Sequence, residues 1–155
     1  MKTLFLDTAN IDEIRRLILS DAIQGVTTNP SLMAKEAKGD YIKKLKEIAF
    51  LIGAAGVSGA SGRRKHLSVE AIGTDHKVIL DQGFRIHESL FTFGVNLYVK
   101  VPVMFDNLSV ITELVRGGVM VNATACMNAI QAKLAADSGA TIVSFFYNQK
   151  EEQNN

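Results

Sequence analysis

The sequence lacks a second cysteine, so Cys126 cannot form an internal disulfide, and it offers no zinc-binding pattern. A chain without disulfides suits a reducing compartment. The sequence also lacks a charge imbalance, because its formal net charge is only +1. It contains no apolar run near the roughly 18 residues that a membrane-spanning helix needs. We therefore expect no nucleic-acid partner and no membrane association.

The amino terminus lacks the features of a secretory leader. Its residues, MKTLFLDTANIDEI, include a lysine and a short apolar stretch, but acidic residues follow at once and no small-residue cleavage site appears. We therefore expect a cytoplasmic protein. Hydrophobic residues make up 47% of the 155 residues and charged residues 21%, which is typical of one soluble globular domain with a substantial core.

Short β-rich runs alternate with helical patterns along the chain. The β-rich runs cover residues 3–9, 25–29, 66–72, 97–103, 119–125 and 141–147. The helical patterns cover residues 11–20, 41–52 and 75–90, a segment from Asp106 or Asn107 to Gly117, and residues 126–139. Residues 53–65, rich in glycine and serine and ending in a basic cluster, are interpreted as a solvated loop. This alternation, about six βα units, predicts a parallel sheet with helices outside it.

Two architectures fit this alternation, a doubly wound open sheet and a barrel. A doubly wound sheet prefers a glycine-rich turn after its first strand, and the corresponding segment, Asp7-Thr8-Ala9-Asn10, contains no glycine. The barrel is therefore favoured, although a complete one has eight strands and usually at least about 200 residues. We predict an α/β fold of the (β/α)8 TIM-barrel type, incomplete, with about six βα units. The domain covers residues 1–147, and a polar tail covers 148–155.

Polar side chains lie toward the carboxyl end of each predicted strand. They are Asp7, Thr27, Asn29, Glu70, Lys100, Asn122, Thr124 and Ser144. The carboxyl ends of the strands converge on the active face of a barrel. Any one of these residues could simply be a strand-terminal residue that faces water. That interpretation is much weaker when each of six strands carries such a residue, so the pattern favours an active site.

Lys100 is the sharpest single feature, because it lies between Val99 and Val101 in an otherwise apolar run. Desolvation lowers the pKa of a buried lysine. A lysine held neutral in such a place is a nucleophile toward carbonyl groups and forms a Schiff base. The alternative is a lysine that extends from the strand end to solvent. The local pattern alone does not choose between the two.

Several of these segments resemble the strand motifs of the transaldolase family, whose small branch includes fructose-6-phosphate aldolase. They are LFLDTAN, GVTTNPSL, LSVEAI, YVKVPV and VNATACMNAIQA, and the resemblance runs from residue 3 to about residue 147. It implies a class I mechanism, without metal or organic cofactor, that acts on a sugar phosphate in the pentose phosphate pathway. The segment GVTTNPSL argues against another lysine aldolase, of the deoxyribose-phosphate type.

The resemblance implies four catalytic residues. Lys100 matches the lysine that forms the Schiff base, and Asp7 matches the acid that handles the hydroxyl proton during carbon–carbon cleavage. Glu70 matches a carboxylate that works through a catalytic water, and Thr124 matches the threonine that positions this water. These types suit the chemistry, because retro-aldol cleavage needs an iminium as electron sink and two acid–base groups. Carboxylates in different surroundings can take these two roles.

The substrate-binding residues that we expect are Asn29, Thr27, Asn122, Ser144 and Phe146. Of these, Asn29 and Asn122 match donors that hold substrate hydroxyls and the carbinolamine, and Ser144 matches a residue lining the donor site. Glutamate at position 70 and Phe146 resemble transaldolases proper, because the aldolase branch usually carries glutamine and tyrosine there.

Two departures from the family pattern stand out. Family members usually have an arginine that binds the substrate phosphate five residues after the Ser144 position, and here that residue is Gln149. Two further strands would also be expected after residue 147. The leading hypothesis is a Schiff-base transaldolase or aldolase, expected to be a homo-oligomer, that transfers or cleaves a dihydroxyacetone unit. The alternative is a catalytically inactive remnant that acts through association.

The remaining chemically active side chains give weaker signals. His66, His76 and His87 share no metal-binding spacing, and we expect each at the surface or in a loop. Cys126 opens a predicted helix, where a thiolate would be favoured, but we expect it to be a small buried residue.

Overall fold

Six parallel strands form one curled sheet in the computed structural model, which describes residues 3–36, 39–57 and 62–145. The strands are β1 (Leu4–Asp7), β2 (Ile23–Thr27), β3 (His66–Glu70), β4 (Asn96–Pro102), β5 (Val121–Cys126) and β6 (Ile142–Phe145). Their spatial order is the chain order, which is the topology of a barrel and differs from that of a doubly wound sheet. The predicted incomplete (β/α) barrel is therefore confirmed.

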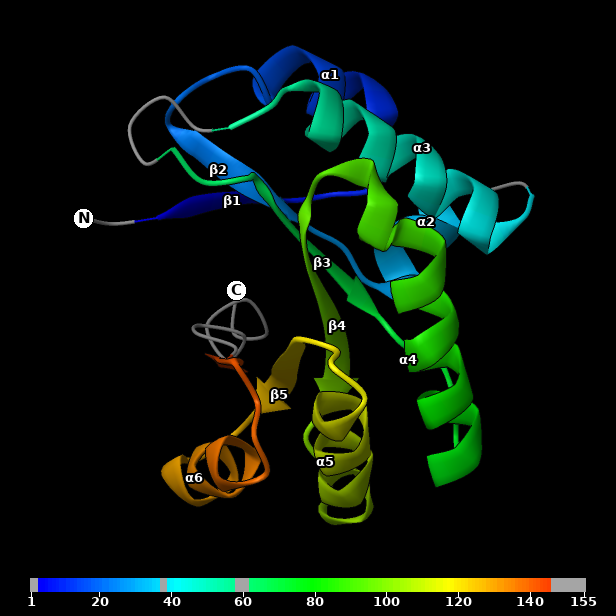
Figure 1. Cartoon of the computed structure of the whole chain (residues 1–155), viewed down its shortest axis with the longest axis vertical. Coiled ribbons are helices and arrows are strands. Elements are labelled where there is room, and N and C mark those ends of the chain that lie inside the picture. The colour runs from blue at the N-terminus through cyan, green and yellow to red at the C-terminus, as the bar shows by residue number, and fades with distance from the viewer. Residues whose placement is uncertain (1–2, 37–38, 58–61, 146–155) are drawn as a thin grey trace, which may run out of the picture.

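The helices lie along the convex side of the sheet and leave its concave side open, as Figure 1 shows. They are α1 (Ile11–Leu17), α2 (Pro30–Glu36), α3 (Tyr41–Ala54), α4 (His76–Leu90), α5 (Leu108–Arg116) and α6 (Ala129–Asp137). Short 3-10 helices, η1 (Phe91–Phe93) and η2 (Phe105–Asn107), lie on either side of β4. Within the described residues, none of the helices is both long and apolar enough to cross a membrane.

Alternation along the strands separates the core from the concave face. Leu67 and Val69 of β3 and Val99 and Val101 of β4 are fully buried and belong to the hydrophobic core that the helices cover. The residues between them point to the opposite side, because successive strand side chains alternate. The concave face therefore carries the polar side chains of the same strands.

Local sequence signals set most helix starts. Asn10 caps α1, since its Oδ1 accepts a hydrogen bond from the Glu13 amide at 2.9 Å, and Asp75 caps α4 through the Val78 amide at 3.0 Å. Helix α2 is absent from the sequence prediction, which placed no helix between residues 29 and 41. Asn29 accepts a hydrogen bond from the Leu32 amide at 3.0 Å, so Asn29-Pro30 is an N-cap followed by proline at the first helical position.

An aromatic stack fills the amino-terminal end of the concave face. The ring of His66 lies between Phe5 and Tyr98, with centroid separations of 4.4 and 4.5 Å. Gly25 pairs with His66 in the ladder and lets the His66 backbone come close to β2, because a Cβ at position 25 would lie 2.2 Å from the His66 carbonyl oxygen. His66 is only 6% exposed, so the expectation of a surface or loop position is wrong for this histidine. Burial lowers the pKa of His66 to about 4.

The buried imidazole should make stability depend on pH. In the unfolded chain the pKa of histidine is about 6.5, so between about pH 6.5 and 4 the unfolded state binds more protons than the folded state. The free energy of unfolding should therefore fall as the pH decreases through this window, by about 3 kcal/mol at most. His66→Phe keeps a ring in the stack and should lose this contribution.

Urea unfolding at pH values from about 7 to 4 measures the effect as the difference between the two proteins. The carboxylates of the chain titrate equally in the wild-type protein and in His66→Phe. An identical loss of stability of the two proteins on acidification would therefore contradict a buried neutral His66.

Candidate functional site

The polar side chains at the carboxyl ends of the strands converge on one cleft. Its volume is about 180 Å³, and its lining residues are Asp7, Thr27, Asn29, Lys100, Asn122, Thr124 and Ser144. Every one of them is a residue that the sequence placed in a candidate site. Glu70 joins the group through its ion pair with Lys100. Phe146 and Gln149 lie outside the described residues.

The register of the parallel ladder explains this convergence. Glu70 pairs with Lys100, and Lys100 pairs with Asn122, so three neighbouring strands bring these side chains to the same level of the concave face. Asp7 pairs with Thr27 in the same way on β1 and β2. The sheet thus positions these groups on rigid strands.

Lys100 lies on the concave face and is only 8% exposed, so it does not extend to bulk solvent. Its Nζ donates a hydrogen bond to the Thr28 carbonyl oxygen at 3.0 Å and lies 3.4 Å from Oε2 of Glu70. The two side chains are 10% and 18% exposed. Burying an ammonium is costly unless it is paired and hydrogen-bonded, and both conditions are met here.

Tyr41, the first residue of α3, is a neighbour of this pair that sequence reasoning missed. Its hydroxyl donates a hydrogen bond to the backbone carbonyl of Glu70 at 2.9 Å. Burial, and secondarily the charge of Glu70, raise the pKa of Tyr41 well above its usual value, so the hydroxyl remains a donor. A tyrosine at a helix start carries no sequence signal for this role.

The two carboxylates of the site have different surroundings. Asp7 is exposed and accepts a hydrogen bond from the Thr27 hydroxyl at 2.8 Å, whereas Glu70 is largely buried beside an ammonium group. Such a difference allows two carboxylates to take different acid–base roles.

The asparagines of the cleft have their side-chain oxygens engaged. The Oδ1 of Asn29 caps α2, and the Oδ1 of Asn122 accepts a hydrogen bond from the Ser144 hydroxyl at 2.7 Å. Both amides therefore offer N–H groups, which suits oxygen atoms of a ligand. Within the described residues, no three His, Cys, Asp or Glu side chains are grouped as metal ligands would be.

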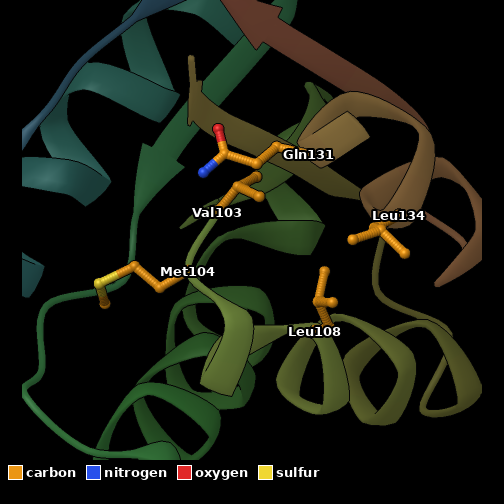
Figure 2. A pocket seen from close by; sticks show the side chains of 5 residues that line it. All are labelled: Val103, Met104, Leu108, Gln131 and Leu134. Carbon is orange, nitrogen blue, oxygen red and sulfur yellow. The ribbon is translucent and has the colours of Figure 1, made fainter. Parts of the chain in front are cut away.

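A second pocket, of about 140 Å³, lies away from this cleft, where the segment after β4 meets α5 and α6 (Figure 2). Its lining residues are Val103, Met104, Leu108, Gln131 and Leu134. Gln131, the one polar residue among them, already uses its Oε1 to accept a hydrogen bond from the Met127 amide at 2.8 Å. No charged side chain of the described residues lines this pocket, whereas Asp7 and Lys100 line the strand-end cleft, so we take that cleft as the candidate site.

Comparison with known proteins shows the family of this chain. Residues 4–154 match the family described as Transaldolase/Fructose-6-phosphate aldolase. The chain belongs to this family. A probable transaldolase of Roseiflexus castenholzii is 38% identical over 143 residues, which are 92% of this chain and 59% of the relative. Probable transaldolases of Cytophaga hutchinsonii and Thermoplasma volcanium are 39% and 38% identical over 145 residues, 92% of this chain and 60% and 58% of the relatives. The chain thus spans about three fifths of the length of these transaldolase relatives.

One strained residue of this transaldolase-family chain adjoins the cleft. Ala125 follows Thr124 and has a φ of 60°, where the register between β5 and β6 also shifts. The left-handed conformation costs a residue with a Cβ about 1–2 kcal/mol, whereas glycine adds about 0.5–1 kcal/mol of unfolded-state entropy. Ala125→Gly should therefore leave the free energy of unfolding unchanged or raise it by up to about 1 kcal/mol.

Ala123→Gly is the matched control for this prediction. Ala123 is fully buried on the same strand without a positive φ, so its replacement should lower the free energy of unfolding by about 1 kcal/mol or more. Denaturant unfolding compares the two variants. Equal destabilisation by both would show that Ala125 stores no strain.

Proposed function

We propose that this protein is a class I transaldolase or aldolase that forms a Schiff base through Lys100. Its substrates would be ketose phosphates such as fructose 6-phosphate or sedoheptulose 7-phosphate, from which it transfers or cleaves a dihydroxyacetone unit. The observation that carries the proposal is the buried Lys100–Glu70 pair, with Lys100 lining a cleft of polar side chains. Relatives named probable transaldolases support it.

Imine formation requires Lys100 to lose a proton before its Nζ attacks the carbonyl carbon. Glu70 is the base within reach, directly or through one water, since its Oε2 lies 3.4 Å from Nζ. The resulting carbinolamine loses its hydroxyl as water when the same carboxyl group returns the proton. The product is an iminium, which accepts the electron pair of the breaking carbon–carbon bond.

Carbon–carbon cleavage requires a base for the proton of the departing hydroxyl group. Asp7 would take this role, since it lines the same cleft and its carboxylate accepts a hydrogen bond from the Thr27 hydroxyl. Thr124 would hold the water that serves Glu70. Asn29, Asn122 and Ser144 would bind the oxygens of the donor sugar, and Thr27 and Phe146 would complete its site.

The proposal extends to the setting in which the enzyme works. We propose a cytoplasmic homo-oligomer of the pentose phosphate pathway that uses neither a cofactor nor a nucleic-acid partner. The alternative of an inactive association module is not favoured, because the described strands bring the reactive groups into one cleft.

Replacing the proposed nucleophile tests the proposal. After incubation with fructose 6-phosphate or dihydroxyacetone and borohydride, the wild-type protein should gain the mass of one reduced ketose. Lys100→Met should gain none, because methionine fills a similar volume but has no amine. Intact-protein mass spectrometry reads the result, and circular dichroism checks the fold.

Lys65→Met is the control for a buried lysine, since Lys65 is 2% exposed and its Nζ donates to the Ser20 and Ile23 carbonyls at 3.1 and 2.6 Å. This variant should still be trapped. Trapping of Lys100→Met would identify Lys100 as the wrong lysine.

Replacing the carboxylate separates chemistry from binding. Glu70→Gln keeps the side-chain shape but removes the base, so the rate of imine formation should fall on the order of 10²-fold or more, with a smaller change in donor affinity. Single-turnover trapping at several ketose concentrations gives both quantities. Glu88→Gln, on the exposed side of α4, is the control and should change neither. A normal rate with a large loss of affinity would count against this role of Glu70.

A further inference from the structure

A chain of buried hydrogen bonds runs from the aromatic stack to the candidate site. His66 Nε2 lies 2.6 Å from the Ser68 Oγ, and Asn122 Nδ2 donates to the same Oγ at 3.1 Å. At the far end, Ser144 Oγ donates to Asn122 Oδ1 at 2.7 Å. His66, Ser68 and Asn122 are at most 6% exposed, and Asn122 reaches the surface of the cleft that it lines.

Two of these bonds have a set direction, and the direction of the third depends on the tautomer of His66. An amide nitrogen can only donate, so Ser68 Oγ accepts from Asn122 and is left with its own hydroxyl proton. A serine oxygen can accept a second bond, so the contact with His66 has two possible forms. In the form in which Ser68 gives its proton to His66, Nε2 is unprotonated and the ring proton is on Nδ1. The low pKa of His66, about 4 through burial, agrees with a neutral ring.

This order decides which groups Asn122 presents to the cleft that it lines. Its Oδ1 is occupied by Ser144, and one Nδ2 proton is occupied by Ser68. The second Nδ2 proton is left for a ligand. The amide consequently offers a donor, which selects an oxygen with a free lone pair, such as a carbonyl, carbinolamine or hydroxyl oxygen.

We propose that His66 is a positioning residue that acts through Ser68 to hold the Asn122 amide as a hydrogen-bond donor to an oxygen of the bound ketose. The ketose rests on the proposed function; the orientation of the amide does not. Phe5 and Tyr98 fix the plane of the imidazole, so its Nε2 is aimed at Ser68 before any ligand binds. His66 itself touches no substrate in this arrangement.

Two replacements of His66 separate the acceptor from the ring stack. His66→Phe keeps a stacked ring and removes the acceptor. His66→Gln loses the ring and supplies an amide oxygen that accepts from Ser68. Two measurements are made on the full chain: nitrogen-15 spectra of the His66 ring and the Asn122 side-chain amide without ligand, and the apparent affinity for fructose 6-phosphate in borohydride trapping.

The proposal expects an unprotonated Nε2 in the wild-type protein and an Asn122 amide resonance that shifts in His66→Phe and returns in His66→Gln. Donor affinity should fall on the order of tenfold in His66→Phe, about one lost hydrogen bond, and recover in His66→Gln. The trapping rate at saturating ketose should change less than the affinity.

A protonated Nε2, or an Asn122 resonance unmoved by His66→Phe, would overturn the proposal. Loss of affinity in His66→Gln as large as in His66→Phe would do the same, because packing of the stack would then be responsible. If the wild-type protein forms no adduct at all, the proposed function fails, and the ligand-free spectra alone decide whether His66 orients Asn122.

Discussion

The burial of one ammonium group is the constraint on which the site depends. A lysine in the middle of an apolar strand is tolerated only if its charge is matched and its protons are accepted. Glu70 supplies the charge, and the Thr28 carbonyl accepts a hydrogen bond. These partners come from β3 and from the end of β2, so the pair can form only when the three strands have their observed register. The reactive group and the order of the sheet thus depend on the same contacts.

The same arrangement of strands gives the carboxylates of Glu70 and Asp7 different surroundings. Glu70 lies beside the ammonium in a largely dry position, and Asp7 lies at the exposed end of β1 with only a threonine hydroxyl bonded to it. Position in the sheet accounts for this difference, because β1 is the first strand of the described sheet, whereas β3 lies between two neighbouring strands. The two bases of the proposed mechanism therefore lie in different surroundings, Asp7 in the cleft and Glu70 beside the Lys100 that lines it.

Sequence alone predicted the strands, the barrel type and the residues of the cleft. The β-rich runs, the helical patterns between them and the polar strand ends are local signals that a parallel sheet translates directly into geometry, and the resemblance to transaldolase motifs pointed to the same residues. It missed features that depend on contacts between distant segments. The burial of His66 requires Phe5, Gly25 and Tyr98 from three other strands, and Tyr41 reaches Glu70 from the start of a helix. Helix α2 could have been predicted, since Asn29-Pro30 is a recognisable helix start, but no helix was predicted there.

Alternation also explains why chemistry and stability do not compete in this fold. On β4, Val99 and Val101 enter the core under the helices, while Lys100 between them faces the cleft. A slip of one residue would exchange these faces and place an ammonium among apolar helix side chains without Glu70. The cost of an unpaired buried charge is several kcal/mol, comparable to the whole stability of a small domain. The lysine that the proposed reaction needs is therefore also a strong determinant of register, because it excludes the alternative pairings that a run of valines alone would permit.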